Sequence, residues 1–172
     1  LGNFVSGSDR QTQGVIDAGV LDHVESLLAH PRKNIRKEAC WLLSNIAAGT
    51  HYQIGHLLGK PRVLMAVIKA LQSDQWEVRK EAAWVISNIC TGGGSKHIEQ
   101  IVELGAIEAI ISTLDVADSK VVSVALEAID AILKTGESLN KLNGYISFVD
   151  EADGIDKIES LQEHENDGIY EK

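Results

Sequence analysis

The chain has 172 residues, of which 44% are hydrophobic and 24% are charged, a composition typical of a folded globular protein. Its formal net charge of −9 disfavours nucleic acid as the main partner, because phosphate binding needs a basic surface, and favours a basic partner or simple solubility. No apolar run approaches the roughly 20 residues of a membrane span, and no signal peptide is recognisable, so we expect no membrane association.

Two cysteines, Cys40 and Cys90, lie inside apolar segments. Free cysteine commonly behaves as a small buried hydrophobic residue, and a disulfide framework would need more cysteines in a shorter secreted chain. We therefore expect both to be core residues in an intracellular, reducing compartment. A redox or metal role is the alternative.

Three triplets of helices, each short, then medium, then long, follow a helix end at residues 1–7. Their apolar residues recur at helical spacing. Because the chain opens inside a repeat, we expect the natural protein to extend further towards its N-terminus. The predicted helices cover 8–17, 20–29 and 34 through Asn45, then 51–58, 63–71 and 75–91, then 96–104, 106–114 and 118–134.

Glycine and proline mark where these helices start and stop. Gly19 and Gly105 interrupt their triplets after the first helix, and Pro61 is expected at a helix start, where its missing N–H costs nothing. Gly49 and Gly92 are expected in the left-handed conformation that commonly ends a helix. The candidate caps for the long helices are Asn34 and Ser73-Asp74.

The last part of the chain is expected to be looser. Residues 136–145 are more polar, a short helix is predicted over 146–152, and 154–161 repeat the pattern of 19–27 with one residue missing. A final helix is expected to begin near Asn166. This region is strongly acidic, because nine Asp or Glu and only two Lys lie from residue 150 onward.

One stretch occurs twice, at residues 36–49 and again 43 residues later at 79–92. Such a period is typical of an α-solenoid, and three helices in each repeat fit armadillo repeats better than two-helix HEAT repeats. The sequence thus predicts an all-α, right-handed armadillo solenoid in a single domain. Its expected divisions are a remnant at 1–7, repeats at about 8–49, 50–92 and 93–136, and C-terminal repeats or a cap at 137–172.

The repeated stretch carries three polar or aromatic residues on one helical face, because they are spaced three and four residues apart. When repeats stack, equivalent residues lie side by side and form rows. Asparagine can bind the backbone of an extended peptide, adjacent indoles can hold the stems of Lys or Arg, and carboxylates can meet their charged heads. The pattern therefore favours a groove for a basic, extended peptide. The two sets are Glu38, Trp41 and Asn45, and Glu81, Trp84 and Asn88.

Core packing is the alternative for a single Trp, and an Asn can simply cap a neighbouring turn. Packing alone would not require a Glu and an Asn on the Trp's own face in two successive repeats. In the third repeat the pattern stops, since the equivalent positions are Leu126 and Asp130. Trp76 lies outside the register and is expected at a packing or rim position. The groove should therefore offer about two complete slots.

Residues 37–46 and 80–89, together with 2–9 and 161–166, resemble the importin-α (karyopherin-α) family of nuclear import adaptors. The resemblance implies the C-terminal part of the family's armadillo domain and its minor site for basic nuclear localisation signals. It assigns signal binding to the Trp, Asn and Glu rows. The further residues that it implies are Asn3, which continues the asparagine row, and Ser6, Asp9 and Thr12, which flank a lysine pocket.

The resemblance also implies partners and a location. Importin-β would bind a segment that is absent from these residues. A CAS-type export receptor and a nucleoporin would recognise the acidic end at 150–171, for which a solvated polar cap is the alternative. The protein would shuttle between cytoplasm and nucleus and would need no cofactor.

Two other functions are weaker. A β-catenin-like scaffold for acidic or helical partners would need Lys- and Arg-rich third helices, whereas these Trp faces carry Glu. Enzymatic activity is disfavoured because the six histidines show no metal-ligand spacing and the glycine-rich segment 92–95 lacks the lysine of a phosphate loop. We therefore expect a peptide-binding protein rather than an enzyme.

Overall fold

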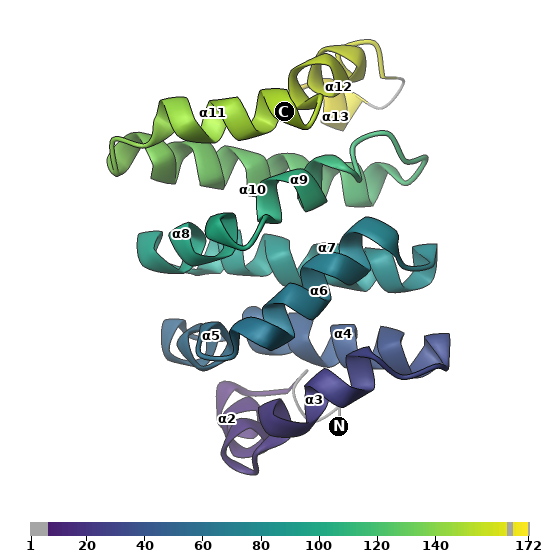
Figure 1. The fold of residues 1–172 in the computed structure, drawn as a ribbon, viewed down its shortest axis with the longest axis vertical. Coiled ribbons are helices and arrows are strands. Elements are labelled where there is room, and N and C mark those ends of the chain that lie inside the picture. The colour runs from purple at the N-terminus through teal and green to yellow at the C-terminus, as the bar shows by residue number, and fades with distance from the viewer. Residues whose placement is uncertain (1–6, 165–166, 172) are drawn as a thin grey trace.

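The computed structural model describes residues 7–164 and 167–171, and these form a stack of helices with no strand among them. In Figure 1 the helices stack along the long axis of the molecule, from α2 (Asp9–Asp17) at one end to α12 (Gly154–Leu161) and α13 (Asp167–Tyr170) at the other. This is the armadillo α-solenoid that the sequence predicts. Each repeat of such a stack buries its apolar face on its neighbours rather than on one central core.

Three helices build each repeat. The short first helices are α2 (Asp9–Asp17), α5 (His51–Leu58) and α8 (Ser95–Glu103), and the second helices are α3 (Val20–Leu28), α6 (Pro61–Ser73) and α9 (Ala106–Ile111). The long third helices are α4 (Lys33–Ala47), α7 (Trp76–Gly92) and α10 (Ser119–Ser138). The third helices begin 43 residues apart, so the predicted period is confirmed.

Two different sequence features turn the chain into the second helix of a repeat. Gly19 and Gly105 precede α3 and α9 with φ angles of 86° and 94°, a left-handed conformation that favours glycine. In the middle repeat Pro61 is the first residue of α6, as the sequence predicts. Arg62, which stands at the glycine position of the register, is therefore helical.

The predicted caps of the long helices are wrong. Asn34 lies within the first turn of α4, and neither α4 nor α7 has a side-chain cap. The Asp74 carboxylate instead accepts from Nε and Nη2 of Arg36, at 2.8 and 2.9 Å. Arg36 also donates to the backbone oxygens of His30 and Pro31. A charged partner in the neighbouring repeat thus competes successfully with the helix end for this carboxylate.

The closing glycines Gly49 and Gly92 are not left-handed, because among the described glycines only Gly19 and Gly105 have a positive φ. Gly92 is instead the last residue of α7. Close approach explains Gly49, since a Cβ there would collide with the Gln53 side chain. That side chain forms a capping box with Thr50, in which Gln53 N–H lies 3.2 Å from Thr50 Oγ1 and Thr50 N–H lies 3.0 Å from Gln53 Oε1. Contact with the next helix, rather than φ, requires glycine at position 49.

The C-terminal part is more regular than the sequence predicts. Helix α10 continues through Gly136, and α11 (Leu142–Glu151) begins four residues before the predicted start. Gly136 is buried and the Tyr145 ring packs against it, so a Cβ there would lie 2.5 Å from ring atom Cδ2. Helix α12 (Gly154–Leu161) covers the predicted echo of 19–27, and α13 (Asp167–Tyr170) packs on α10. Asn166, the predicted start of the last helix, lies outside the described residues.

The third helices carry the largest share of the core. Helix α7 buries the equivalents, 43 positions later, of all seven buried residues of α4. The predicted burial of Cys40 and Cys90 is confirmed, and burial raises the pKa of both thiols to about 12. Within the described ranges, no helix combines the length and the apolar character that crossing a membrane would take.

We expect Gly136→Ala to lower the free energy of unfolding by about 1–3 kcal/mol, although alanine favours helix, because the added Cβ overpacks against Tyr145. Gly14→Ala in α2 is the matched control, since nothing lies within 4 Å of a Cβ there. It should leave stability unchanged or raise it by up to about 1 kcal/mol. Urea unfolding followed by circular dichroism measures both, and equal effects of the two substitutions would contradict the tight contact.

Candidate functional site

The six predicted ridge residues, which we call the ladder, lie along α4 and α7, two helices that pack side by side. Because the buried residues of the two helices share one register, their outward ridges are aligned as well. Most ladder residues have an intermediate exposure, which leaves part of each side chain accessible to a ligand. The half-buried residues are Trp41, Asn45, Glu81, Trp84 and Asn88, whereas Glu38 is exposed.

One of the two ladder asparagines also links neighbouring repeats. Asn88 Nδ2 donates to the backbone oxygen of Ser44 in the preceding repeat, at 3.0 Å. Asn45 Nδ2 is buried and has no hydrogen-bond partner in the described part of the chain. By register, the position that corresponds to Ser44 is residue 1, which lies outside the described residues. A carboxamide can serve both purposes, because its nitrogen can bind the neighbouring repeat while its oxygen accepts from a ligand N–H.

Glu38 and Glu81 form the acidic row. Burial raises the pKa of Glu81 above its ordinary value, Lys37 and Lys80 partly offset this rise, and the Glu38 carboxylate adds to it. The Glu38 carboxylate thus disfavours ionisation of Glu81. A ligand cation that bound to Glu81 would have the opposite effect and lower its pKa.

A cation of the chain itself already lies on Trp84. Lys120 Nζ, from α10, is 5.8 Å from the centre of the Trp84 ring, within the range of a cation–π contact. A cavity of about 510 Å³ adjoins this pair and is lined by residues of α7, α10 and α13. Sequence reasoning missed Lys120 because only the stacking of repeats brings α10 to Trp84. Trp76, by contrast, is partly buried against the core. Arg79 of its own helix lies over its ring, with Arg79 Cζ 5.6 Å from the ring centre.

The third repeat lacks the ladder Trp and Asn, but its register differs by one residue from the prediction. Helices α7 and α10 begin 43 positions apart, whereas the prediction used 42. With 42 positions the exposed Lys120 and Glu127 would both fall at core positions, whereas 43 positions places only the exposed Asp130 at one, that of the small Ser87. The equivalents of Trp84 and Asn88 are therefore Glu127 and Ala131, instead of Leu126 and Asp130.

The remaining predicted site residues belong to the N-terminal part of the chain. Asn3 and Ser6 lie outside the described residues. Asp9 is exposed at the start of α2, and its backbone oxygen accepts from Gln53 Nε2 at 2.8 Å, which joins α2 to α5. Thr12 is buried in the same helix. The structure thus places Asp9 and Thr12 on the first helix of a repeat, whereas the ladder is built from third helices.

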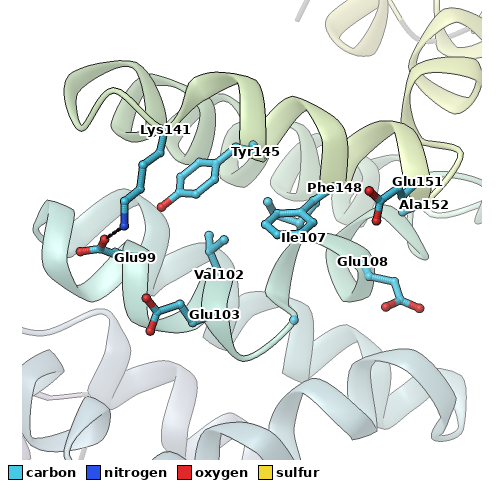
Figure 2. Close-up of a pocket in the computed structure, with 12 residues that line it drawn as sticks. Glu99, Val102, Glu103, Ile107, Glu108, Lys141, Tyr145, Phe148, Glu151 and Ala152 are labelled. Carbon is cyan, nitrogen blue, oxygen red and sulfur yellow. Dashed lines mark hydrogen bonds and ion pairs between the residues drawn. The ribbon is translucent and has the colours of Figure 1, made fainter.

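A second candidate site is a pocket of about 720 Å³ between α8, α9 and α11. Figure 2 shows carboxylates around an apolar floor that includes Phe148, whose side chain is half exposed. Lys141 is ion-paired with Glu99, and this pairing raises the pKa of Lys141. The pocket therefore offers apolar contact together with a surplus of negative charge. Its glutamates are Glu99, Glu103, Glu108 and Glu151.

The acidic pocket differs from the acidic surface that the sequence predicts at 150–171. Only Glu151 belongs to that run, whereas the other three glutamates come from α8 and α9. The packing of α11 on α9 and α10 brings them together. In the described part of the chain, no three His, Cys, Asp or Glu side chains gather as a metal site.

Three family models match parts of the chain. The model described as "Armadillo/beta-catenin-like repeat" matches residues 8–48, and the "Atypical Arm repeat" model matches 143–172. The "HEAT repeat" model matches 64–93, which covers most of α6 and α7. These two helices without α5 are a two-helix unit, which explains why a HEAT model fits a three-helix repeat.

The chain is 43% identical over 152 residues to importin subunit alpha-4 of Arabidopsis thaliana, a match that covers 85% of this chain and 28% of that protein. It is 40% identical over 178 residues to importin subunit alpha-1b of Oryza sativa subsp. japonica, covering 100% of this chain and 33% of that protein. The chain thus spans about a third of the length of these curated relatives. A solved designed armadillo repeat protein, in complex with the peptide (KR)4, is 32% identical with a TM-score of 0.84, covering 99% of this chain and 68% of that one.

We expect Glu81→Gln to raise the free energy of unfolding at pH 7. Because the pKa of Glu81 is raised in the folded state, folding is favoured when this group is protonated, and that stability is lost as the pH rises from 4.5 through the raised pKa. Thermal unfolding between about pH 4 and 7 should show this component in the wild type and not in Glu81→Gln.

Glu77→Gln is the matched control with the opposite sign, because a hydrogen bond and ion pair with Lys33 at 3.0 Å lowers the pKa of Glu77. It should be less stable than the wild type at pH 7, and the difference should fade as the pH falls below 4.5. A Glu81→Gln protein that is less stable than the wild type at pH 7 would show that the carboxylate contributes to the fold.

Proposed function

Because this chain belongs to the armadillo-repeat family and its repeats are of the importin-α type, we propose that it is part of a nuclear import adaptor whose ladder binds basic nuclear localisation signals. The observation that carries the proposal is the alignment of two half-buried indoles with two carboxylates on adjacent, equivalent helices. A designed armadillo protein that is similar over nearly the whole chain was solved with the peptide (KR)4, which is basic.

Each row of the ladder has a separate role in this proposal. The aliphatic stem of a Lys or Arg side chain lies against Trp41 or Trp84, which contributes about 0.5–2 kcal/mol per cation–π contact. Glu38 and Glu81 bind the charged head, and the Asn88 carboxamide oxygen accepts an N–H of the peptide backbone. Because a single contact is weak, useful affinity needs several rungs.

The same family membership supports a role for the N-terminal residues and for the division of the chain. We propose that Asn3 continues the asparagine row and that Ser6, Asp9 and Thr12 flank a lysine pocket, Thr12 from a buried position. We propose a single domain with a remnant at 1–7, repeats at 8–49, 50–92 and 93–136, and C-terminal repeats at 137–172. The helix triplets that begin with α2, α5 and α8 support this division.

The acidic pocket supports a second contact. We propose that basic segments of a CAS-type export receptor and a nucleoporin bind at this end of the solenoid, with a Lys or Arg among the glutamates and an apolar side chain against Phe148. Importin-β would bind a segment outside these 172 residues. An adaptor with these partners shuttles between cytoplasm and nucleus and acts by binding rather than by catalysis.

Replacing both ladder indoles should weaken the main interaction. We expect Trp41→Ala combined with Trp84→Ala to weaken binding of a basic signal peptide by about tenfold or more, because two cation–π slots are lost. Isothermal titration measures the affinity, and circular dichroism shows whether helicity is retained. Trp76→Ala is the matched control, since Trp76 lies outside the ladder and binds Arg79. An unchanged affinity in a folded double variant would refute the proposed function.

Reversing charge in the acidic pocket should affect the second contact alone. We expect Glu108→Lys with Glu151→Lys to weaken binding of the export receptor or nucleoporin by about tenfold and to leave signal-peptide binding unchanged. The control, Glu159→Lys with Glu163→Lys, makes the same charge change at exposed residues of the acidic end that do not line the pocket. Surface plasmon resonance on the immobilised chain compares them, and equal losses would mean that general acidity, not the pocket, attracts these partners.

A further inference from the structure

Lys120 has an unexpected charge for its place in the repeat. It is the second residue of α10, and the second residues of α4 and α7 are Asn34 and Glu77. Glu77 lies 36 positions after Trp41, and Lys120 lies 36 positions after Trp84, so the two residues are equivalent in the register. The residue at this position therefore changes from an acid, Glu77, which is paired with Lys33 at 3.0 Å, to a base at the last rung.

The first turn of a helix is an unfavourable place for a cation. The unpaired backbone N–H groups there carry partial positive charge, which favours glutamate and disfavours lysine. Asp118 caps the start of α10 by accepting from the N–H groups of Lys120 and Val121, at 3.1 and 3.3 Å. The Lys120 side chain reaches across to the preceding repeat, where its ammonium lies on the Trp84 indole.

This ammonium lies on the group that would attract a cation of a bound peptide. Indole faces bind Lys and Arg through the same cation–π attraction, whichever chain supplies the cation. Among the described residues, Trp76 holds a cation of its own helix and Trp84 holds one of the next repeat, whereas no such pair includes Trp41. The two ladder indoles therefore differ in whether the chain already occupies them.

We propose that Lys120 determines the specificity of the last rung: it occupies Trp84 as a built-in cation that a basic peptide must displace. This proposal rests on the proposed function and deepens it. A peptide cation then binds more tightly at Trp41, for which no such pair is found among the described residues, than at Trp84, on which Lys120 lies. Lys120 thus sets the C-terminal limit of the groove.

The surroundings give the displaced side chain somewhere to go. Lys120 is exposed and lies between two cavities, one of about 510 Å³ beside Trp84 and one of about 740 Å³ beside Trp76. Rotation of the Lys120 side chain from the first to the second would vacate the indole without any movement of the backbone. Competition between the two cations is therefore sterically possible.

Lys120→Met tests the proposal, because methionine keeps much of the aliphatic stem and removes the charge. The probe is the peptide (KR)4, titrated by fluorescence anisotropy at constant ionic strength. We expect Lys120→Met to bind it about three- to tenfold more tightly than the wild type, since the peptide no longer competes with Lys120 for Trp84. In a Trp84→Ala background the same substitution should bring no such gain.

Lys69→Met is the matched control, since Lys69 is exposed on α6 and its loss makes the same change in net charge. A second readout is independent of affinity. The protons on Cε of Lys120 should show an upfield ring-current shift in the nuclear magnetic resonance spectrum, which Trp84→Ala or saturation with (KR)4 should remove.

The outcomes separate this proposal from the proposed function. If the wild type binds (KR)4 and Lys120→Met binds it no more tightly than Lys69→Met does, the role of Lys120 is refuted and the function stands. If only Lys120→Met binds the peptide, the competition is stronger than expected and the proposal holds. If neither protein binds a basic peptide, both proposals are overturned.

Discussion

The packing of α4 on α7 is the interaction on which the rest of the molecule depends. The seven buried residues of α4 have seven buried equivalents in α7, each 43 positions later. Each added residue turns an α-helix by about 100°. An insertion before α7 would therefore leave the apolar face of α7 buried only if a loop accommodated the extra residue. The matching pattern within the two helices is therefore the consequence of burying the same face in each repeat. The aligned outward rows of Trp, Asn and Glu follow from that burial and need no separate cause.

Polar links between repeats reinforce this register. Arg36 joins α4 to Asp74 of the next repeat with both side chains largely buried, and Arg79 in the same position of α7 donates to the backbone oxygens of Leu71 and Ser112. A buried arginine is costly unless such partners satisfy it, so each link favours one alignment of its neighbours over the others. The next position of the series is Val122, and the arginine links therefore stop at the same repeat as the ladder.

The sequence predicts this structure where a local pattern decides the outcome and fails where a neighbouring repeat does. Helix α5 and the starts at Pro61 and after Gly19 and Gly105 follow from apolar spacing and backbone preference. Asp74 was mistaken for a cap because its partner, Arg36, lies 38 residues away in the chain. Lys120 and the acidic pocket were missed for the same reason, since each combines residues of different repeats.

The contrast between Glu77 and Lys120 gives a physical account of how a repeating groove can end. Stacked repeats tend to continue their surface, so a groove made of equivalent rungs has no intrinsic limit. The next helix has Glu127 and Ala131 at the positions of the Trp and Asn, so no indole and no carboxamide extends these rows beyond the last rung. Placing Lys120 on Trp84 adds a competitor at the last rung itself. The loss of these rows alone would leave a basic peptide free to overhang, whereas a like charge at the last rung opposes that register, and specificity commonly needs such a repulsive element.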